Sequence, residues 1–154
     1  MSEDFPFAPR GDHRALEEGD ELAPAFGANG LLSAVVTDAE SGEVLMLAHM
    51  NAEALRLTLV TGLAHYWSRA RRRLWKKGEQ SGHVQELVEA RIDCDQDAVW
   101  LRVRQHGPGA CHVGYRSCFY RRIEREGAAR GRLSFVMDRS FDPNATYGAG
   151  EGGE

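Results

Sequence analysis

Three aspartates and a cysteine fall within five consecutive residues of the segment IDCDQDAVW, residues 92–100. The segment reads as a β-strand, although strands disfavour aspartate. Because side chains alternate along a strand, Asp93, Asp95 and Asp97 are expected on one face, with Cys94 on the other. Three adjacent carboxylates repel one another unless a cation neutralises them, and oxygen ligands suit Mg²⁺ or Ca²⁺. The alternative is a solvated acidic edge strand.

The same spacing opens the calcium loop of an EF-hand. That loop needs glycine at its sixth position and glutamate at its twelfth. Ala98 and Arg104 occupy these positions here, so the sequence excludes an EF-hand.

The chain has three cysteines, Cys94, Cys111 and Cys118. An odd number in a chain without a secretion signal argues against a disulfide framework. The spacing lacks the paired Cys-x-x-Cys knuckles of structural zinc sites, whereas three thiolates would leave a fourth zinc position open for water, as catalytic zinc requires. A closed structural zinc site would need another ligand, such as His112. Buried free thiols are the remaining alternative.

Positive charge is concentrated in the segment HYWSRARRRLWKKGEQSGHVQ, residues 65–85, where six arginines and lysines stand against Glu79 alone. Arginine binds phosphate bidentately, and Trp67 and Trp75 could stack on a base. Gly78, Ser81 and Gly82 favour a loop whose backbone N–H groups approach an anion. We therefore expect a nucleotide-phosphate site here. A solvated hairpin with two core tryptophans is the alternative, and a zinc-containing module that binds single-stranded nucleic acid is another.

Composition excludes several other classes. The net charge of −4 argues against general nucleic-acid coating. No apolar run is long enough to span a membrane, and the N-terminus lacks the basic and apolar regions of a signal peptide. A cytoplasmic protein is expected, with no membrane partner.

The elements that must position these residues follow from periodicity and turn signals. Residues 31–38 and 43–50 are apolar runs joined by a turn with Ser41-Gly42, which predicts a β-hairpin. Asn51 suits an N-cap and Gly62 a helix end, so a helix is expected over about 52–61. Further strands are expected at 65–69, 84–93, 98–105, 117–123 and 133–138. The fold class is α+β, with mostly antiparallel strands and few helices.

The chain divides into three parts. Residues 1–30 hold seven acidic residues against two arginines with little periodicity, which predicts a mobile leader. Residues 31–140 should form one domain. The glycine-rich residues 141–154 should form a disordered tail.

Read in order, LMLAHMN, YWSRARRRLWKKGEQSG, DCDQD and CHVGYRSCF resemble the signature blocks of phosphoribosyl-AMP cyclohydrolase, a histidine-biosynthesis family. The blocks span about residues 31–120. The resemblance implies that Cys94, Cys111 and Cys118 bind zinc across the interface of an intertwined homodimer, and that Asp93, Asp95 and Asp97 bind magnesium. The short sequence after the last block leads us to expect no fused pyrophosphohydrolase domain.

The resemblance also implies a phosphorylated nucleotide substrate with an N1-ribosylated adenine, whose C6–N1 bond is hydrolysed with zinc-activated water. His112 is the expected proton shuttle, provided that the chain turns at Cys111–His112. His83 and His49 depart from the usual pattern of the blocks. The expected substrate-binding residues are Arg69, Arg73, Trp75, Lys76, Lys77, Gly78, Glu79, Ser81 and Gly82.

Overall fold

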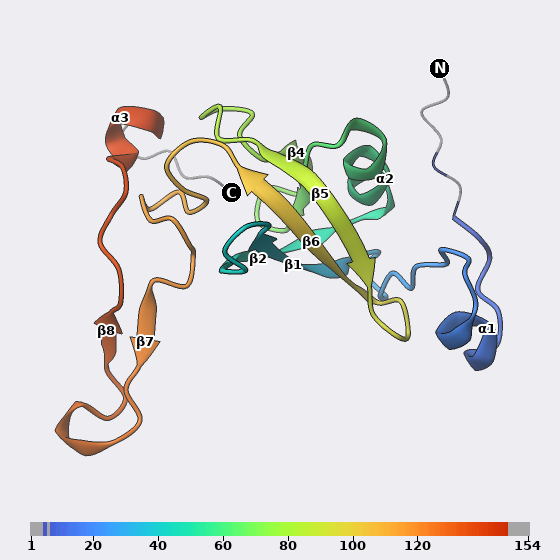
Figure 1. Cartoon of the computed structure of the whole chain (residues 1–154), viewed down its shortest axis with the longest axis horizontal. Helices are drawn as coiled ribbons and strands as arrows, with labels where there is room; N and C mark the ends of the chain where they lie inside the picture. Colours follow the sequence, from blue (N-terminus) through green and yellow to red (C-terminus); the bar gives the residue numbers. More distant parts are fainter. Residues whose placement is uncertain (1–4, 6, 148–154) are drawn as a thin grey trace.

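The computed structural model describes residue 5 and residues 7–147. Its centre is a four-stranded sheet in the order β2-β1-β6-β5, built from β1 (Leu32–Asp38), β2 (Val44–Met50), β5 (Gln85–Ile92) and β6 (Ala98–Gln105) (Figure 1). The β1–β2 and β5–β6 pairs are antiparallel, and the central β1–β6 pair is parallel. The predicted α+β class is confirmed. The structure is that of one chain, so the intertwined homodimer stays a prediction.

The β1–β2 hairpin forms where the sequence predicts it. One carboxylate oxygen of Asp38 accepts the N–H groups of Glu40 at 3.1 Å and Ser41 at 2.7 Å, which closes the turn. Gly42 follows at φ 78°, in the left-handed region that favours glycine. The turn brings Glu43, at its end, close to the loop that carries two of the cysteines.

One face of the sheet is covered by helix α2 (Ala52–Thr61) and by a hairpin of β3 (His65–Ser68) and β4 (Arg73–Lys76). Asn51 caps the helix by accepting the N–H of Ala54 at 2.8 Å, and Gly62 ends it at φ 74°, as predicted. Leu55, Tyr66 and Trp75 pack into the core against the sheet. Because Tyr66 and Trp75 are anchored in the core, the basic residues of the β3–β4 hairpin have a fixed position relative to the sheet.

The opposite face of the sheet is less covered. Val35 pairs with Leu47 on one side and with Trp100 on the other, so these three side chains form a row across β2, β1 and β6. Leu47 is 54% exposed. Trp100 is tied to the sheet by its indole N–H, which donates to the Thr37 hydroxyl at 2.7 Å.

The aspartates do not lie on an extended strand, so that part of the prediction was wrong. β5 ends at Ile92 and β6 begins at Ala98, and residues 93–97 form the turn between them. Asp93 accepts the N–H groups of Asp97 at 3.0 Å and Ala98 at 3.2 Å. This turn gathers the three carboxylates, because bonding of aspartate to its own backbone competes with strand pairing.

Residues 7–30 contain a short helix and several apolar contacts with the body. Helix α1 (His13–Glu18) is followed by the buried Ala23, and Phe7 and Phe26 pack against the core. These apolar residues, separated by acids, anchor the segment to the body. The mobility of the leader stays a prediction.

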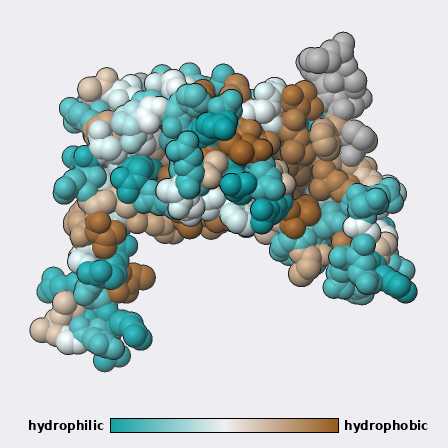
Figure 2. Space-filling model, in the orientation of Figure 1, coloured by the Kyte–Doolittle hydropathy of each residue, from teal (hydrophilic) through white to brown (hydrophobic). Residues whose placement is uncertain are grey.

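The chain after the last cysteine forms a projecting hairpin, which we call the arm: β7 (Arg121–Ile123), the short 3-10 helix η1 (Gly127–Ala129) and β8 (Leu133–Phe135). It extends away from the central sheet, as does α1 at the other end of the molecule (Figures 1 and 2). Helix α3 (Pro143–Tyr147) follows. Of the tail predicted to be disordered, residues 148–154 lie outside the described residues.

Candidate active site

The turn at residues 93–97 gathers carboxylates closely enough to share a cation. Asp93, Asp95 and Asp97 each offer a ligand atom, and these atoms lie within 4.8 Å of one another. All three side chains are exposed, so a bound ion could complete its shell with water or substrate oxygens. A hard, oxygen-only donor set of this kind fits Mg²⁺.

The pKa values of Asp93 and Asp97 are shifted in opposite directions. Hydrogen bonding to Asp95 and then to Asp93, followed by burial and like-charge repulsion, raises the pKa of Asp97 to about 6. Burial raises the pKa of Asp93, but hydrogen bonds from Asp97 and from backbone N–H groups outweigh it and leave the pKa lowered. Without a cation, the cluster therefore keeps a proton below about pH 6.

A first prediction follows from this proton. Divalent-ion affinity at the turn is expected to rise with pH through about 6 and to level off above it, because the ion must displace the proton on Asp97. Below the pKa, each pH unit should weaken binding about tenfold. Titration of zinc-loaded protein with Mn²⁺ at several pH values measures this. Flat affinity between pH 5 and 7 would contradict it, and Asp97→Asn is the control that should remove the dependence.

Cys111 and Cys118 lie side by side in a second loop at the other end of β6. A hydrogen bond from Cys118, opposed by burial and aided by Val113, His112 and Lys77, lowers the pKa of Cys111 to about 6. The N–H of Gly114 donates to the carbonyl of Cys111 at 3.1 Å, so the expected turn at Cys111–His112 is present. Two neighbouring thiols, one of them with a lowered pKa, are a suitable donor set for zinc.

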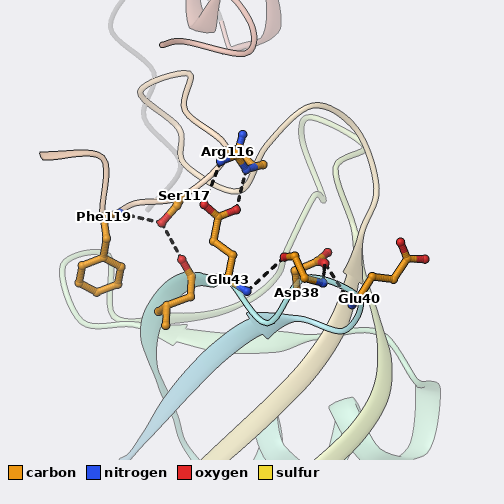
Figure 3. A network of polar contacts seen from close by, with 8 residues as sticks. Asp38, Glu40, Glu43, Arg116, Ser117 and Phe119 are labelled. Atoms are coloured by element: carbon orange, nitrogen blue, oxygen red, sulfur yellow. Dashed lines mark hydrogen bonds and ion pairs between the residues drawn. The ribbon is translucent and has the colours of Figure 1, made fainter. Parts of the chain in front are cut away.

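Polar contacts with the β1–β2 turn hold this cysteine loop in place (Figure 3). Arg116 donates from Nε and Nη2 to the two carboxylate oxygens of Glu43, at 2.6 and 2.9 Å. The Ser117 hydroxyl donates to the Val44 carbonyl at 2.7 Å, and the N–H of Cys118 donates to the Leu45 carbonyl, also at 2.7 Å. Glu43 and Arg116 also line a cavity of about 520 Å³. Sequence reasoning missed Glu43 and Arg116, which stand 73 residues apart.

Cys94 is remote from this pair within one chain. It lies in the turn before β6, whereas Cys111 and Cys118 follow the other end of the strand. Eight residues of extended strand separate the two ends by roughly 25 Å. Among the described residues, the three aspartates alone form a group of potential metal ligands within one chain. The three cysteines therefore do not meet in a single protomer.

The basic segment forms a cavity of about 300 Å³ around the β4 loop. Its lining includes most of the expected binding residues, namely Arg73, Trp75, Lys76, Lys77, Gly78, Glu79 and Ser81, but neither Arg69 nor Gly82. Gly78 has φ 86°, and a Cβ there would lie 2.5 Å from the nitrogen of Val84. Only glycine allows this close approach, which shapes the loop.

Lys77 points into the protein from this loop. It is 6% exposed, donates to the carbonyl of Ala110 and lies 5.6 Å above the ring of Trp75. The loop is therefore joined to the residue preceding Cys111. Trp75 and His83 each keep a buried nitrogen without a hydrogen-bond partner in the described chain. Burial, and then the charge of Lys77, lowers the pKa of His83.

His112 lies exposed on the turn next to Cys111. It therefore stands next to Cys111 with its side chain open to solvent. The structure thus brings His112, Cys111, Cys118 and Lys77 together, and it places Cys94 and the aspartates at the opposite end of the hairpin.

Fold and site together define a small α+β enzyme that carries thiol, carboxylate and basic groups on loops around one sheet. A family model described as phosphoribosyl-AMP cyclohydrolase matches residues 46–120. The chain is 60% identical over 134 residues to the phosphoribosyl-AMP cyclohydrolase of Rhodopseudomonas palustris strain HaA2, covering 86% of this chain and 90% of that protein. It is 58% identical over 139 residues to the enzyme of that name from Brucella anthropi, covering 90% and 96%.

The chain belongs to the phosphoribosyl-AMP cyclohydrolase family. The resemblance seen in the sequence blocks is confirmed, and the protein is an enzyme of the cyclohydrolase class. No helix among the described residues has both the length and the apolar character needed to cross a membrane.

Proposed function

We propose that this enzyme hydrolyses the C6–N1 bond of 1-(5-phosphoribosyl)-AMP in histidine biosynthesis, with zinc at the cysteines and magnesium at the aspartates. The observation that carries the proposal is the lowered pKa of Cys111 beside Cys118, in a loop whose Arg116 lines a cavity of about 520 Å³ and within the segment that matches the family. Water adds to C6, the C6–N1 bond breaks, C6 becomes a carboxamide carbonyl and N1 takes up a proton. No redox step is needed.

Zinc held by Cys94, Cys111 and Cys118 would supply Lewis-acid activation of the attacking water. The chain's own residues do the rest. His112, on the exposed turn, delivers the proton to N1, since a positioned histidine is the side chain most often used for such a transfer. The contacts of Arg116 and Ser117 with the β1–β2 turn keep the thiol loop in one geometry.

Substrate phosphates are bound by the loop after β4. Arg73 and Lys76 line its cavity, and Arg73 is held in place by an ion pair of 3.0 Å with Glu79. Glu79 also accepts the N–H of Lys76 at 3.0 Å, which closes the loop. Magnesium at the aspartate turn would neutralise a phosphate or orient the ribose hydroxyls.

We further propose a homodimer in which Cys94 of one protomer completes the zinc site with Cys111 and Cys118 of the other. The separation of the thiols along β6 supports this arrangement, because one chain cannot gather them. The arm supports it as well, since Ile123 is 72% and Phe135 62% exposed on a hairpin that projects from the body. The apolar row on the open sheet face offers a second surface.

The proposed zinc ligands also bear on the cellular compartment of the enzyme. Three zinc-ligating thiolates need reducing conditions, which supports a cytoplasmic enzyme.

Turnover of phosphoribosyl-AMP by purified protein, followed by ultraviolet absorbance, tests the proposed reaction, with zinc measured on the same sample. Turnover with about one zinc per chain is expected, on the ligand count above. His112→Asn should lower kcat by about 10²-fold to 10⁴-fold while zinc content stays unchanged. An unchanged kcat would remove His112 from the proton transfer. Zinc without turnover would overturn the proposed reaction.

A further inference from the structure

Gln96 sits in the middle of the aspartate turn in an unusual conformation. Its φ is 59°, in the left-handed region where glycine or asparagine is the normal choice. Its side chain is nevertheless 96% buried, since its exposed fraction is 4%. A long amide that is buried from a turn tip must be held by specific partners, because an unpaired buried amide is costly.

Those partners all belong to the leader. The side-chain oxygen of Gln96 accepts the N–H of Ala23 at 2.8 Å. The amide nitrogen donates to the carbonyls of Leu16 at 3.2 Å and Glu21 at 3.3 Å. The backbone carbonyl of Gln96 accepts the N–H of Ala25 at 2.7 Å. The leader thus satisfies both ends of the amide with its own backbone.

A second contact reaches the same turn from another part of the leader. Arg10 donates from Nη1 to the carbonyl of Asp95 at 3.1 Å and to the carbonyl of Ala23 at 2.9 Å. Phe7 and Phe26, on either side of these residues, pack against the core. The leader is therefore fixed to the body at its ends and to the turn in its middle.

We propose that residues 7–27 act as a brace that holds the aspartate turn in its ligand geometry, with Gln96 as the positioning residue; this rests on the proposed magnesium site. Three like charges within 4.8 Å push the turn open, and the brace opposes that opening. Cation binding and docking of the leader then stabilise each other, because coupling between two binding events is reciprocal. A cavity of about 360 Å³ at this junction also borders Cys94.

The test compares Gln96→Gly with the wild type in the full-length, zinc-loaded protein, with Mn²⁺ as a paramagnetic substitute for Mg²⁺. Glycine suits the backbone conformation, so this variant removes the side-chain contacts without adding strain. Mn²⁺ affinity should fall about tenfold to a hundredfold, as for other residues that support metal ligands. Tryptic cleavage after Arg14 should become faster, and Mn²⁺ should slow it in the wild type alone.

The matched control is Arg72→Gly. Arg72 also has positive φ, at 54°, but it lies in the β3–β4 turn away from the leader. This variant should keep wild-type Mn²⁺ affinity. Arg10→Ala is a second, milder variant that removes the contact with Asp95, and it decides the question if Gln96→Gly does not fold. Its affinity should fall less than tenfold but measurably.

Outcomes for the brace and for the magnesium site are separable. If Mn²⁺ binds the wild type and Asp97→Asn equally, the proposed magnesium site is wrong. If binding depends on Asp97 but Gln96→Gly and Arg10→Ala bind as tightly as the wild type, the site stands and the brace is overturned.

Discussion

Mixing two inactive variants, Cys94→Ala and Cys118→Ala, is expected to restore about one quarter of wild-type activity, because a symmetric dimer would then contain some intact sites. Each variant alone lacks a zinc ligand in both of its sites. Random exchange of subunits makes half of the dimers mixed, and each mixed dimer has one complete site of two. The measurement is turnover and bound zinc after co-refolding equal amounts of the two variants with zinc.

A second mixture controls for nonspecific rescue. Cys111→Ala and Cys118→Ala alter two ligands that lie in the same loop of one chain. No combination of these two variants contains a complete site, so neither activity nor zinc should return. Restoration in this control, or none in the first mixture despite proven subunit exchange, would show that the ligands are not shared as proposed.

Ile123→Asp in the arm is expected to dissociate the dimer and to remove zinc and activity together. Ile123 is 72% exposed in the single chain, so an aspartate there should not disturb the fold of the protomer. At an interface, a buried aspartate costs several kcal/mol, and a two-fold dimer contains the change twice. The dissociation constant should therefore rise roughly a thousandfold. Sedimentation at micromolar concentration and zinc analysis measure both effects.

Arg130→Asp is the matched control, since it places the same charge at an exposed position near the arm tip, after η1. It should remain dimeric and active. If Ile123→Asp also stays dimeric with full zinc content, the arm does not form the interface.

Local sequence signals predicted the scaffold well. Asn51 and Gly62 mark the ends of α2 because their side-chain and backbone preferences act within a few residues. The alternation of apolar residues predicted a strand at residues 98–105, and these are the observed bounds of β6. These elements depend on neighbours in the chain, so the sequence carries the signal directly.

Longer-range features escaped prediction for a physical reason. The gathering of the aspartates depends on Asp93 bonding its own turn, where strand periodicity indicated a different arrangement. No local pattern in the sequence indicated the role of Gln96, since its hydrogen-bond partners stand more than 70 residues earlier in the chain. The ion pair of Glu43 with Arg116 is similarly distant. The cation site at the aspartates was predicted from residue type and spacing, the assignment of zinc to the cysteines came from the resemblance, and all of these roles stay predictions.

The parallel pairing of β1 with β6 sets the order in which the site can be assembled during folding. Its register joins Ser33 to Ala98 and Asp38 to Val103, so it closes a loop of 65 residues. Hairpins form in microseconds from local contacts, whereas closing a long loop is slower and costs more chain entropy. The aspartate turn and the cysteine loop lie at opposite ends of β6, so both reach their final positions only when this late step is complete. A nascent chain can therefore contain every hairpin while its aspartate turn and its cysteine loop still lack their final positions relative to β1 and β2.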